Sequence, residues 1–394
     1  MDLDQHEKKQ TQRQTPKLRF PGFKDPWEQR KLGDMCQITM GQSPDGSTYS
    51  EEPSDYILVQ GNADLKDGWV NPRIWTTQKT KTAQAGDLIM SVRAPAGAMG
   101  KTAYDVILGR GVAGIKGNEF LYQSLVKMDS NGYWKKMAAG STFESVNSDI
   151  VKNADMIVPQ AMEEQEKIGS YFRNLDRLIT LQQRKLNILK QYKLGVLTAI
   201  LFGKIDFDNG SNFNWKSCHL SDVFNLRKDE PISSPDLNKI LTVRLHMNGI
   251  VLNNKSETLK PGATKFYIRH AGDFIFGVQN LHNGAFGIIP NEYDGYLTAQ
   301  SIPSLSFKEN ICKEFILYYF EANYVKLNRF THGTGAKSIT AKELLTLKIM
   351  LPTYEEQIKI ATLLSKLDSC IKVHNTQLNQ LKQLKNALLQ KMFV

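Results

Sequence analysis

Residues 91–104 read SVRAPAGAMGKTAY and contain the triplet Gly100-Lys101-Thr102, which could be the end of a phosphate-binding loop. Such a loop has the spacing G-x-x-x-x-G-K-[ST], because its backbone N–H groups must surround the phosphates. The first glycine would stand at position 95, where the chain has Pro95, which has no N–H to donate. The spacing therefore argues against a nucleotide site.

Other patterns with possible chemistry are equally incomplete. An adenine methyltransferase needs a D/N-P-P-Y/F box, but NPRI (71–74) and DPWE (25–28) each lack the second proline, and no F-x-G-x-G segment is present. Pro44-Asp45 followed by Asp64-Leu65-Lys66 loosely fits the PD…(D/E)-x-K pattern with which nucleases hold Mg²⁺. This pattern is common by chance, and the seven histidines show no paired-ligand spacing. We expect no catalytic residue, no metal site and no cofactor in this chain.

Composition limits the class of protein. The 394 residues include 50 Lys and Arg against 40 Asp and Glu, a formal charge of +10. This balance favours a polyanionic partner such as nucleic acid, although ordinary solubility would explain it equally well. The four cysteines lie far apart, which suggests a reducing compartment. No apolar run approaches the roughly 20 residues that span a bilayer. We expect a cytoplasmic protein without a membrane partner, and a disordered polar tail over residues 1–16.

The chain contains one unit twice. GSTFESVNSDIVKNADMIVP (140–159) shares its pattern with GTGAKSITAKELLTLKIMLP (333–352), and MEEQEKIGSYFRNLDRLI shares its pattern with YEEQIKIATLLSKLDSCI directly afterwards. Trp27 opens the first copy and Trp215 the second. The repeat is therefore a unit of about 190 residues, used twice.

Each unit ends in a pattern typical of a long helix. Apolar residues follow a 3.5-residue period over 161–203 and over 353–394, and Thr353 with Glu356 predicts a capping box at the second start. We expect the two helices to form an antiparallel coiled coil; the alternative is that each seam packs on its own globular domain. The polar breaks at Gln182 and His374 are interpreted as register devices. The predicted seam consists of Ile168, Phe172, Leu175, Ile179, Leu186, Leu189, Ile360, Leu364, Leu367, Ile371, Leu378 and Leu381.

Before each helix, short β-rich runs alternate with Gly, Asn and Asp turns, which predicts an α+β globule with a twisted sheet. The expected organisation is a first globular domain over 17–160, and a linker with a second domain over 204–352, related by a pseudo-twofold internal repeat. AGDLIMSVRAPAGAMGKTAYD (85–105) aligns with AGDFIFGVQNLHNGAFGIIPNEYD (271–294), so that Lys101-Thr102 corresponds to Ile288-Ile289. The common role of this loop therefore cannot be nucleotide binding.

The two copies of this loop differ in their polar tips. The first has Arg93, and the second has Gln279, Asn280, His282 and Asn283. Arginine pairs with guanine edges and Asn or Gln with adenine edges. A repeated scaffold with exchanged tips suits a protein that reads two different DNA half-sites.

On these residues the chain resembles the specificity subunit of a Type I restriction–modification enzyme, from about residue 17 to the C-terminus. The similarity lies in GDLIMSVRAPAGAMG, the GSTFESV…IVP segment, the EEQEKI…LDRLI helix start and their second copies. The resemblance implies two target recognition domains that read a split double-stranded DNA site, with the helices setting the half-site spacing. It also implies two methyltransferase subunits as partners, and two restriction/translocase subunits in the full complex. AdoMet, ATP and Mg²⁺ would bind those partners.

Basic residues and loop tips are the candidate DNA contacts, with a solvated surface as the alternative: Arg73, Arg93, Lys101, Ser141, Thr142, Arg244, Gln279, Asn280, His282, Asn283 and Lys337. We expect the interleaved aromatics Trp69, Trp75, Trp134 and Phe330 to lie in the core. Two other functions fit less well. One is a specificity chain of a Type II-style system that serves a fused methyltransferase-nuclease, and the other is a coiled-coil adaptor without a DNA role.

Overall fold

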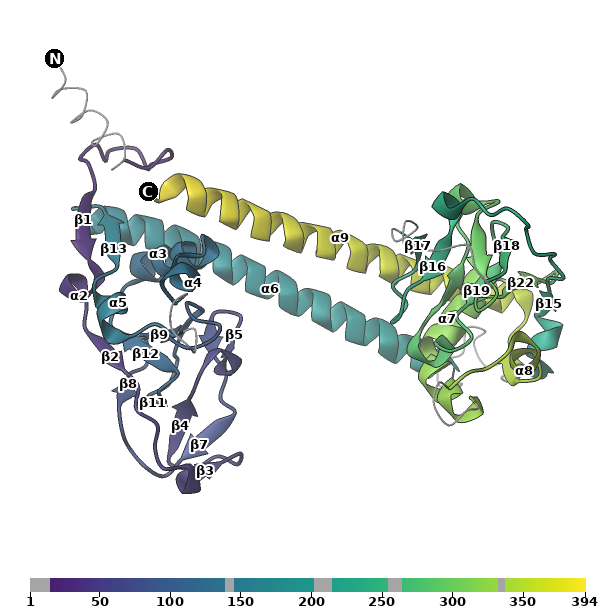
Figure 1. Cartoon of the computed structure of the whole chain (residues 1–394), viewed down its shortest axis with the longest axis horizontal. Helices are drawn as coiled ribbons and strands as arrows, with labels where there is room; N and C mark the ends of the chain where they lie inside the picture. Colours follow the sequence, from purple (N-terminus) through teal and green to yellow (C-terminus); the bar gives the residue numbers. More distant parts are fainter. Residues whose placement is uncertain (1–14, 139–144, 202–214, 254–263, 332–336) are drawn as a thin grey trace, which may run out of the picture. The chain divides into compact units, whose positions relative to one another are not determined.

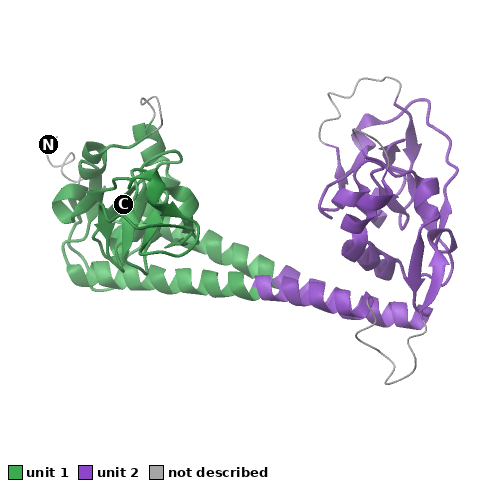
Figure 2. Cartoon of the chain, turned by 90° about the horizontal axis from the view of Figure 1, so that it is seen from below, with its two compact units in different colours: residues 1–185, 374–394 green, residues 186–373 purple. Residues whose placement is uncertain are grey.

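The computed structural model describes residues 15–138, 145–201, 215–253, 264–331 and 337–394. It divides into two compact units, of which unit 1 holds residues 1–185 and 374–394 and unit 2 holds residues 186–373 (Figure 2). Each unit thus combines one globular part with the beginning of one long helix and the end of the other. Of the expected disordered tail, residues 1–14 lie outside the described residues, whereas Pro16 is buried.

Unit 1 contains two main sheets and a short two-stranded pair (Figure 1). The sheet orders are β2-β12-β9-β10-β6-β5 and β3-β7-β4-β11-β8, and β1 pairs antiparallel with β13. The strands are β1 (Glu28–Lys31), β2 (Ile38–Met40), β3 (Tyr49–Ser50), β4 (Tyr56–Val59), β5 (Leu65–Lys66), β6 (Trp69–Val70), β7 (Ile74–Thr76), β8 (Thr82–Ala83), β9 (Leu88–Ser91), β10 (Met99–Lys101), β11 (Val106–Leu108), β12 (Val112–Ile115) and β13 (Asp155–Val158).

Helices α3 and α5 of unit 1 begin at side-chain caps. Helix α3 (Glu119–Ser130) starts where the Asn118 side chain accepts from the Leu121 N–H, and α5 (Ser148–Lys152) starts in the same way at Asn147. The short helices α2 (Leu32–Met35) and α4 (Tyr133–Ala138) complete the unit. Strands β9 and β12 lie inside the sheet and are buried along their whole length, because their near-continuous apolar sequences are covered on both faces.

Unit 2 repeats this plan with fewer paired strands. Its largest sheet has the order β15-β22-β19-β20, and β14-β23, β16-β17 and β18-β21 form antiparallel pairs. Helix α7 (Lys313–Asn323) precedes α8 (Ala341–Leu345). The strands are β14 (Lys216–His219), β15 (Phe224–Leu226), β16 (Leu241–Val243), β17 (Ile250–Leu252), β18 (Phe266–Ile268), β19 (Phe274–Phe276), β20 (Phe286–Ile288), β21 (Leu297–Ala299), β22 (Ser304–Phe307) and β23 (Lys348–Leu351).

Two long helices, α6 (Met162–Leu201) and α9 (Tyr354–Met392), follow the two globular parts. The capping box predicted for α9 is confirmed: the Thr353 N–H donates to the Glu356 carboxylate at 3.0 Å, and the Glu356 N–H donates to Thr353 Oγ1 at 3.3 Å. The helices pack antiparallel. In unit 1 the α6 residues Asp176 and Gln182 contact progressively earlier residues of α9, namely Lys385 and then Gln377 and His374.

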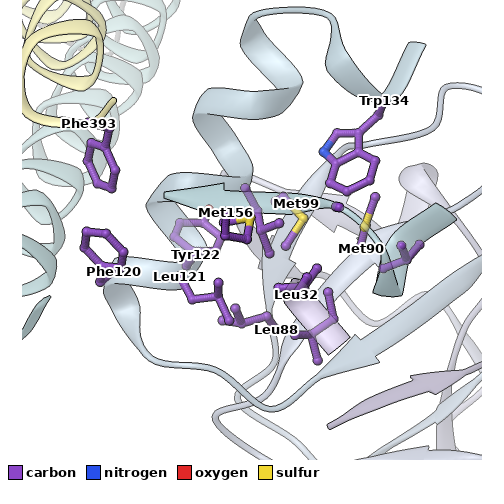
Figure 3. Close-up of a cluster of buried hydrophobic side chains, with 14 of the residues drawn as sticks. Leu32, Leu88, Met90, Met99, Phe120, Leu121, Tyr122, Trp134, Met156 and Phe393 are labelled. Atoms are coloured by element: carbon purple, nitrogen blue, oxygen red, sulfur yellow. The ribbon is translucent and has the colours of Figure 1, made fainter. Parts of the chain in front are cut away.

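The predicted seam residues are all buried or half-buried, but they do not all face the other helix alone. Ile168 and Phe172 belong to the core of the first globular part, together with Trp27 and Phe120. Phe393, just beyond α9, enters the same core and stacks on Phe120 with a ring-centroid distance of 5.1 Å (Figure 3). The core of unit 2 likewise combines Ile360 and Leu364 of α9 with Leu197 and Ile200 of α6. Both packing modes considered from the sequence therefore occur along one seam.

Candidate nucleic-acid interface

Gly100-Lys101-Thr102 belongs to strand β10 and to the residue that follows it. A side chain at Gly100 would place its Cβ 2.8 Å from Leu65 of strand β5, which packs against this position. In unit 2 the matching Gly287 faces Ile250 of β17, 3.2 Å from the position of an added Cβ. The shared glycine therefore makes room for a neighbouring hairpin in both units.

The Lys101 side chain is held inside unit 1 and is only 12% exposed. Its Nζ lies 3.0 Å from the Glu119 carboxylate, 5.0 Å from the Trp69 ring centroid and 4.4 Å from that of Tyr122. Thr102 is buried, and its hydroxyl donates to the Tyr104 carbonyl at 2.7 Å. These intrachain contacts leave Lys101 poorly placed for a phosphate.

Arg93 lies in the turn between β9 and β10 and is exposed. The turn packs on the core: an added Cβ at Gly97, which has a φ of +106°, would meet the Asp129 carboxylate and the Trp134 ring. The Val146 N–H donates to the Val92 carbonyl at 2.9 Å, which connects the turn to the end of the segment that contains Ser141 and Thr142. Ser141 and Thr142 themselves lie outside the described residues. The turn is thus a supported base for an outward-facing arginine.

Arg73 follows the β5–β6 hairpin and is oriented by a buried carboxylate. Its guanidinium lies 3.0 Å from Asp64, whose side chain is 3% exposed and also accepts the backbone N–H groups of Gln60 and Gly61. Half of the Arg73 side chain stays exposed. Lys101 pairs with Leu88 at one end of strand β9, whereas Arg93 lies beyond Ser91 at the other end. The unit 1 candidates that the structure describes therefore do not form a single cluster.

In unit 2 the structure brings most candidates together. Arg244 lies in the turn of the β16–β17 hairpin, whose tip bonds to the loop that carries Asn280, His282 and Asn283. The His246 N–H donates to the Asn283 carbonyl at 2.8 Å, and the Met247 N–H donates to the Gly284 carbonyl at 2.9 Å. His246 and Met247 both have a φ of +57°, so these two bonds hold a strained tip against the loop.

The polar side chains of this loop are half-buried or exposed, whereas Leu281 is buried in the core. The Asn283 amide donates to Asn280 Oδ1 at 3.1 Å, and Gln279 is exposed. His282 Nδ1 is buried and has no hydrogen-bond partner in the described part of the chain. Any external contact of His282 must therefore use its other ring nitrogen.

A second segment extends this surface. The 3-10 helix Tyr324–Phe330 packs against the 3-10 helix Leu281–Asn283. The exposed Lys337 reaches this helix, with its Nζ 3.3 Å from Asn328 Oδ1. Arg329 stacks over the Phe330 ring at 4.9 Å. Asn328 and Arg329 are not among the residues singled out from the sequence, although they directly precede the interleaved aromatic Phe330.

The expectation of buried aromatics is only partly met. Trp134 is fully buried and Trp75 is half-buried, but Trp69 is 45% exposed and Phe330 is 37% exposed. Both exceptions are stacked by a cation from their own unit, Lys101 over Trp69 and Arg329 over Phe330. Such stacking orients an exposed ring, because the cation is attracted to the ring face.

The carboxylates of the loose nuclease pattern are engaged in local contacts. Asp45 accepts the N–H and the hydroxyl of Ser47, and these hydrogen bonds lower the pKa of its carboxyl group. Asp64 is held by Arg73. Within the described ranges, no group of three or more His, Cys, Asp and Glu side chains is arranged to hold a metal ion. In the same ranges, no helix has the length and apolar character needed to cross a membrane.

Comparisons with known proteins agree with this architecture. Residues 24–191 and 212–383 each match the family described as Type I restriction modification DNA specificity domain. The chain is 22% identical over 406 residues to the Type I restriction enzyme MjaVIII specificity subunit of Methanocaldococcus jannaschii, covering 94% of this chain and 92% of that protein. It is 29% identical over 189 residues to MjaX, named as a specificity subunit in the same organism; these cover 45% of this chain and only 43% of that relative.

A solved structure shows the same fold. The S subunit of a Type I restriction–modification system from M. genitalium superposes with a TM-score of 0.65 over 96% of this chain and 99% of that chain, at 13% identity. The family match covers both repeats and most of the sequence. The chain therefore belongs to the family of DNA specificity subunits of Type I restriction–modification systems.

Proposed function

We propose that this chain is the non-catalytic DNA-reading part of a Type I restriction–modification complex, and that each globular part reads one half of a split double-stranded site. The observation that carries the proposal is a shared strand–turn–strand framework with different polar tips: Arg93 between β9 and β10, and the polar residues of the segment 279–283 between β19 and β20. Guanine presents two acceptors in the major groove, which suit arginine, whereas adenine suits Asn or Gln. The two half-sites should therefore differ.

In unit 2 the proposed DNA-contacting face consists of the hairpin turn at Arg244, the loop 279–283 and Lys337. Asn328 and Arg329 join it because their helix packs on the loop. The amides would contact base edges, and the cations would neutralise phosphates. A formal charge of +10 on the chain supports such salt-dependent binding.

In unit 1 the proposal keeps Arg93 and Arg73 as DNA contacts, with Ser141 and Thr142 as further candidates. Lys101 is left out because its ammonium group is occupied by Glu119 and lies between two aromatic rings. Its role is to hold strand β10 and Trp69 in place.

The paired helices α6 and α9 are proposed to set the distance between the half-sites. A helix of 40 residues extends about 60 Å at about 1.5 Å per residue, and an antiparallel partner stiffens it. We propose that the first recognition domain comprises residues 17–160, and that the second, together with the linker, comprises residues 204–352. The DNA between the half-sites would remain unread.

The outer faces of these helices are proposed to bind two methyltransferase subunits. Exposed apolar residues recur at matching repeat positions: Tyr171 and Leu363, Leu181 and Val373, Tyr192 and Leu384. Two similar patches suit two copies of one partner. Two restriction/translocase subunits would complete the complex. AdoMet, ATP and Mg²⁺ would bind these partners, and the complex would act in the cytoplasm.

Exchange of one recognition domain tests whether each domain reads its half-site independently of the other. Replacing residues 17–159 by the matching segment of another specificity subunit should change one half of the methylated site and leave the other half intact. The reason is that each framework carries its own tips. Sequencing of methylated adenines in cells that carry the complex is the measurement. A change in both halves would contradict independent reading.

Arg93 and Lys101 should behave oppositely when they are removed. Arg93→Ala should weaken binding to one half-site by about 1–3 kcal/mol and leave unfolding unchanged, because a bidentate base contact is lost from an exposed side chain. Lys101→Met should lower the free energy of unfolding by about 1–3 kcal/mol with little effect on base preference, because Glu119 loses a buried partner. Fluorescence anisotropy with duplex DNA and urea unfolding separate these effects, and the reverse pattern would reject the assignment.

Lengthening both helices tests the spacing role. Inserting one heptad into α6 after Leu186 and one into α9 after Ile371 adds about 10 Å, which is about three base pairs of DNA. The spacer of the methylated sites should grow by about that amount, with unchanged half-sites. Because the DNA also turns, the joints at Pro159 and Pro352 must absorb a rotation. An active variant with an unaltered spacer would show that the helices do not set the distance.

Charges on the apolar patches should prevent assembly. Leu181→Asp combined with Val373→Asp should abolish co-purification of the methyltransferase and reduce methylation at least about tenfold, because desolvating a carboxylate at an interface is costly. DNA binding by the purified chain should persist. The exposed polar positions Asn375 and Gln380, each changed to Asp, are matched controls. Normal assembly of the Leu181→Asp, Val373→Asp variant would contradict this docking site.

A further inference from the structure

The two long helices contain one aspartate each at matching positions of the repeat, Asp176 in α6 and Asp368 in α9. In unit 1 the Asp176 carboxylate lies 2.6 Å from Lys385 Nζ of the other helix. It also accepts a hydrogen bond of 2.8 Å from Gln123 of α3, which belongs to the globular part and is fully buried. Asp176 is therefore a junction between its own helix, the opposite helix and the recognition domain.

Unit 2 builds the same junction with a tyrosine of the globular part in place of the glutamine. The Asp368 carboxylate lies 2.7 Å from Lys193 of α6, whose side chain is 10% exposed. The Tyr318 hydroxyl of α7 donates to Asp368 at 2.7 Å. Burial, together with the bond to Asp368, raises the pKa of Tyr318, so the hydroxyl stays protonated and remains a donor. Lys193 also contacts Glu321 of α7 at 2.8 Å.

In unit 1 the junction continues to strand β10, at the end of that strand away from the Arg93 turn. Gln123 also donates to Glu119 at 3.0 Å, and Glu119 holds Lys101 at the end of strand β10. A continuous series of polar contacts thus runs from strand β10, through α3 and Asp176, to Lys385 of the opposite helix. These side chains are mostly buried, so their mutual geometry is held more firmly than that of a surface ion pair.

The two junctions imply one register for the helix pair. The step from Asp176 to Lys193 along α6 equals the step from Lys385 back to Asp368 along α9. An apolar seam with a heptad period does not by itself distinguish this register from one shifted by seven residues. The aspartates do, because a heptad shift would place Asp176 opposite Leu378 or Met392, and Asp368 opposite Leu186 or Ile200. All four of those side chains are buried.

We infer that Asp176 and Asp368 are positioning residues that fix each recognition domain to the register of both helices, and so narrow the range of half-site spacings that the complex accepts. Gln182 supports the same register between them, with its amide 2.8 Å from His374 Nδ1 and 3.0 Å from Gln377 Oε1. The inference rests on the proposed role of the helices in setting the spacing.

The experiment measures the distribution of spacer lengths among methylated sites in cells that carry the full complex. In the Asp176→Ala variant, methylation at sites one base pair longer or shorter should rise about threefold or more relative to the preferred spacing, because one coupled contact has been lost. Lys385→Ala should broaden the distribution in the same way. The exchange Asp176→Lys with Lys385→Asp should narrow it again, since the ion pair is restored with opposite polarity.

Matched variants separate positioning from general stability. Glu166→Ala removes an exposed acid from the same helix and should leave the distribution unchanged. If Asp176→Ala does not fold, Asp176→Asn keeps the shape and removes the charge. Asp368→Asn provides the equivalent test in unit 2. A purely structural role predicts less methylation at every spacing with the same distribution, and this result would overturn the inference.

The heptad insertion distinguishes this failure from failure of the proposed function. One outcome is that the insertion moves the preferred spacer length while the aspartate variants leave the width of the spacer-length distribution unchanged. In that case the helices set the distance between half-sites and the junctions do not narrow it. If the insertion leaves the spacing unaltered, the proposed spacing role itself is wrong, and the inference falls with it.

Discussion

The largest hydrophobic core of each unit contains the beginning of one long helix and the end of the other. In unit 1, Ile168 and Phe172 share a core with Leu389, Met392 and Phe393, more than two hundred residues later in the chain. In unit 2, Ile360 and Leu364 share a core with Leu197 and Ile200. A helix therefore cannot slide or separate without withdrawing apolar side chains from a core, and the burial of these residues holds each globular part on the helix pair.

Polar contacts select one register of the two long helices, which apolar burial alone does not do. A heptad seam of Leu and Ile is nearly equivalent after a shift of one heptad, whereas an aspartate moved opposite Leu or Ile loses its partner and is desolvated. Lys193 and Lys385, the partners of Asp368 and Asp176, stand at positions of the apolar period, as Gln182 and His374 do. The polar residues within the seam, together with the aspartates that they contact, thus determine the register of the two helices.

The two globular parts show how one framework supports different surfaces. Gly100 and Gly287 are required in both, since each gives space to a side chain of a neighbouring hairpin, Leu65 in one unit and Ile250 in the other. The turn between the framework strands packs on the core through Gly97 in one unit and Leu281 in the other, whereas its polar positions are exposed or half-buried. Arg93 can therefore stand where the second unit has an amide-rich loop. The proposed reading of two unlike half-sites requires this combination, in which the strands keep their packing and the turns vary in their polar residues.

The sequence by itself determined the repeat, the two long helices, the helix cap at Thr353 and the family, because these depend on local periodicity and on the similarity of one half of the chain to the other. It also indicated that Lys101-Thr102 is no phosphate loop, since the second copy has Ile288-Ile289. Only the tertiary structure decided which candidates share a surface. The hairpin turn that carries Arg244 is bonded to the loop of Asn283, because the His246 N–H donates to the Asn283 carbonyl. Lys101, in contrast, turns inward to Glu119, and Trp69, which was expected in the core, is 45% exposed. Such outcomes depend on partners distant in the chain, and neither composition nor local spacing reveals which partner a charged or aromatic side chain will find.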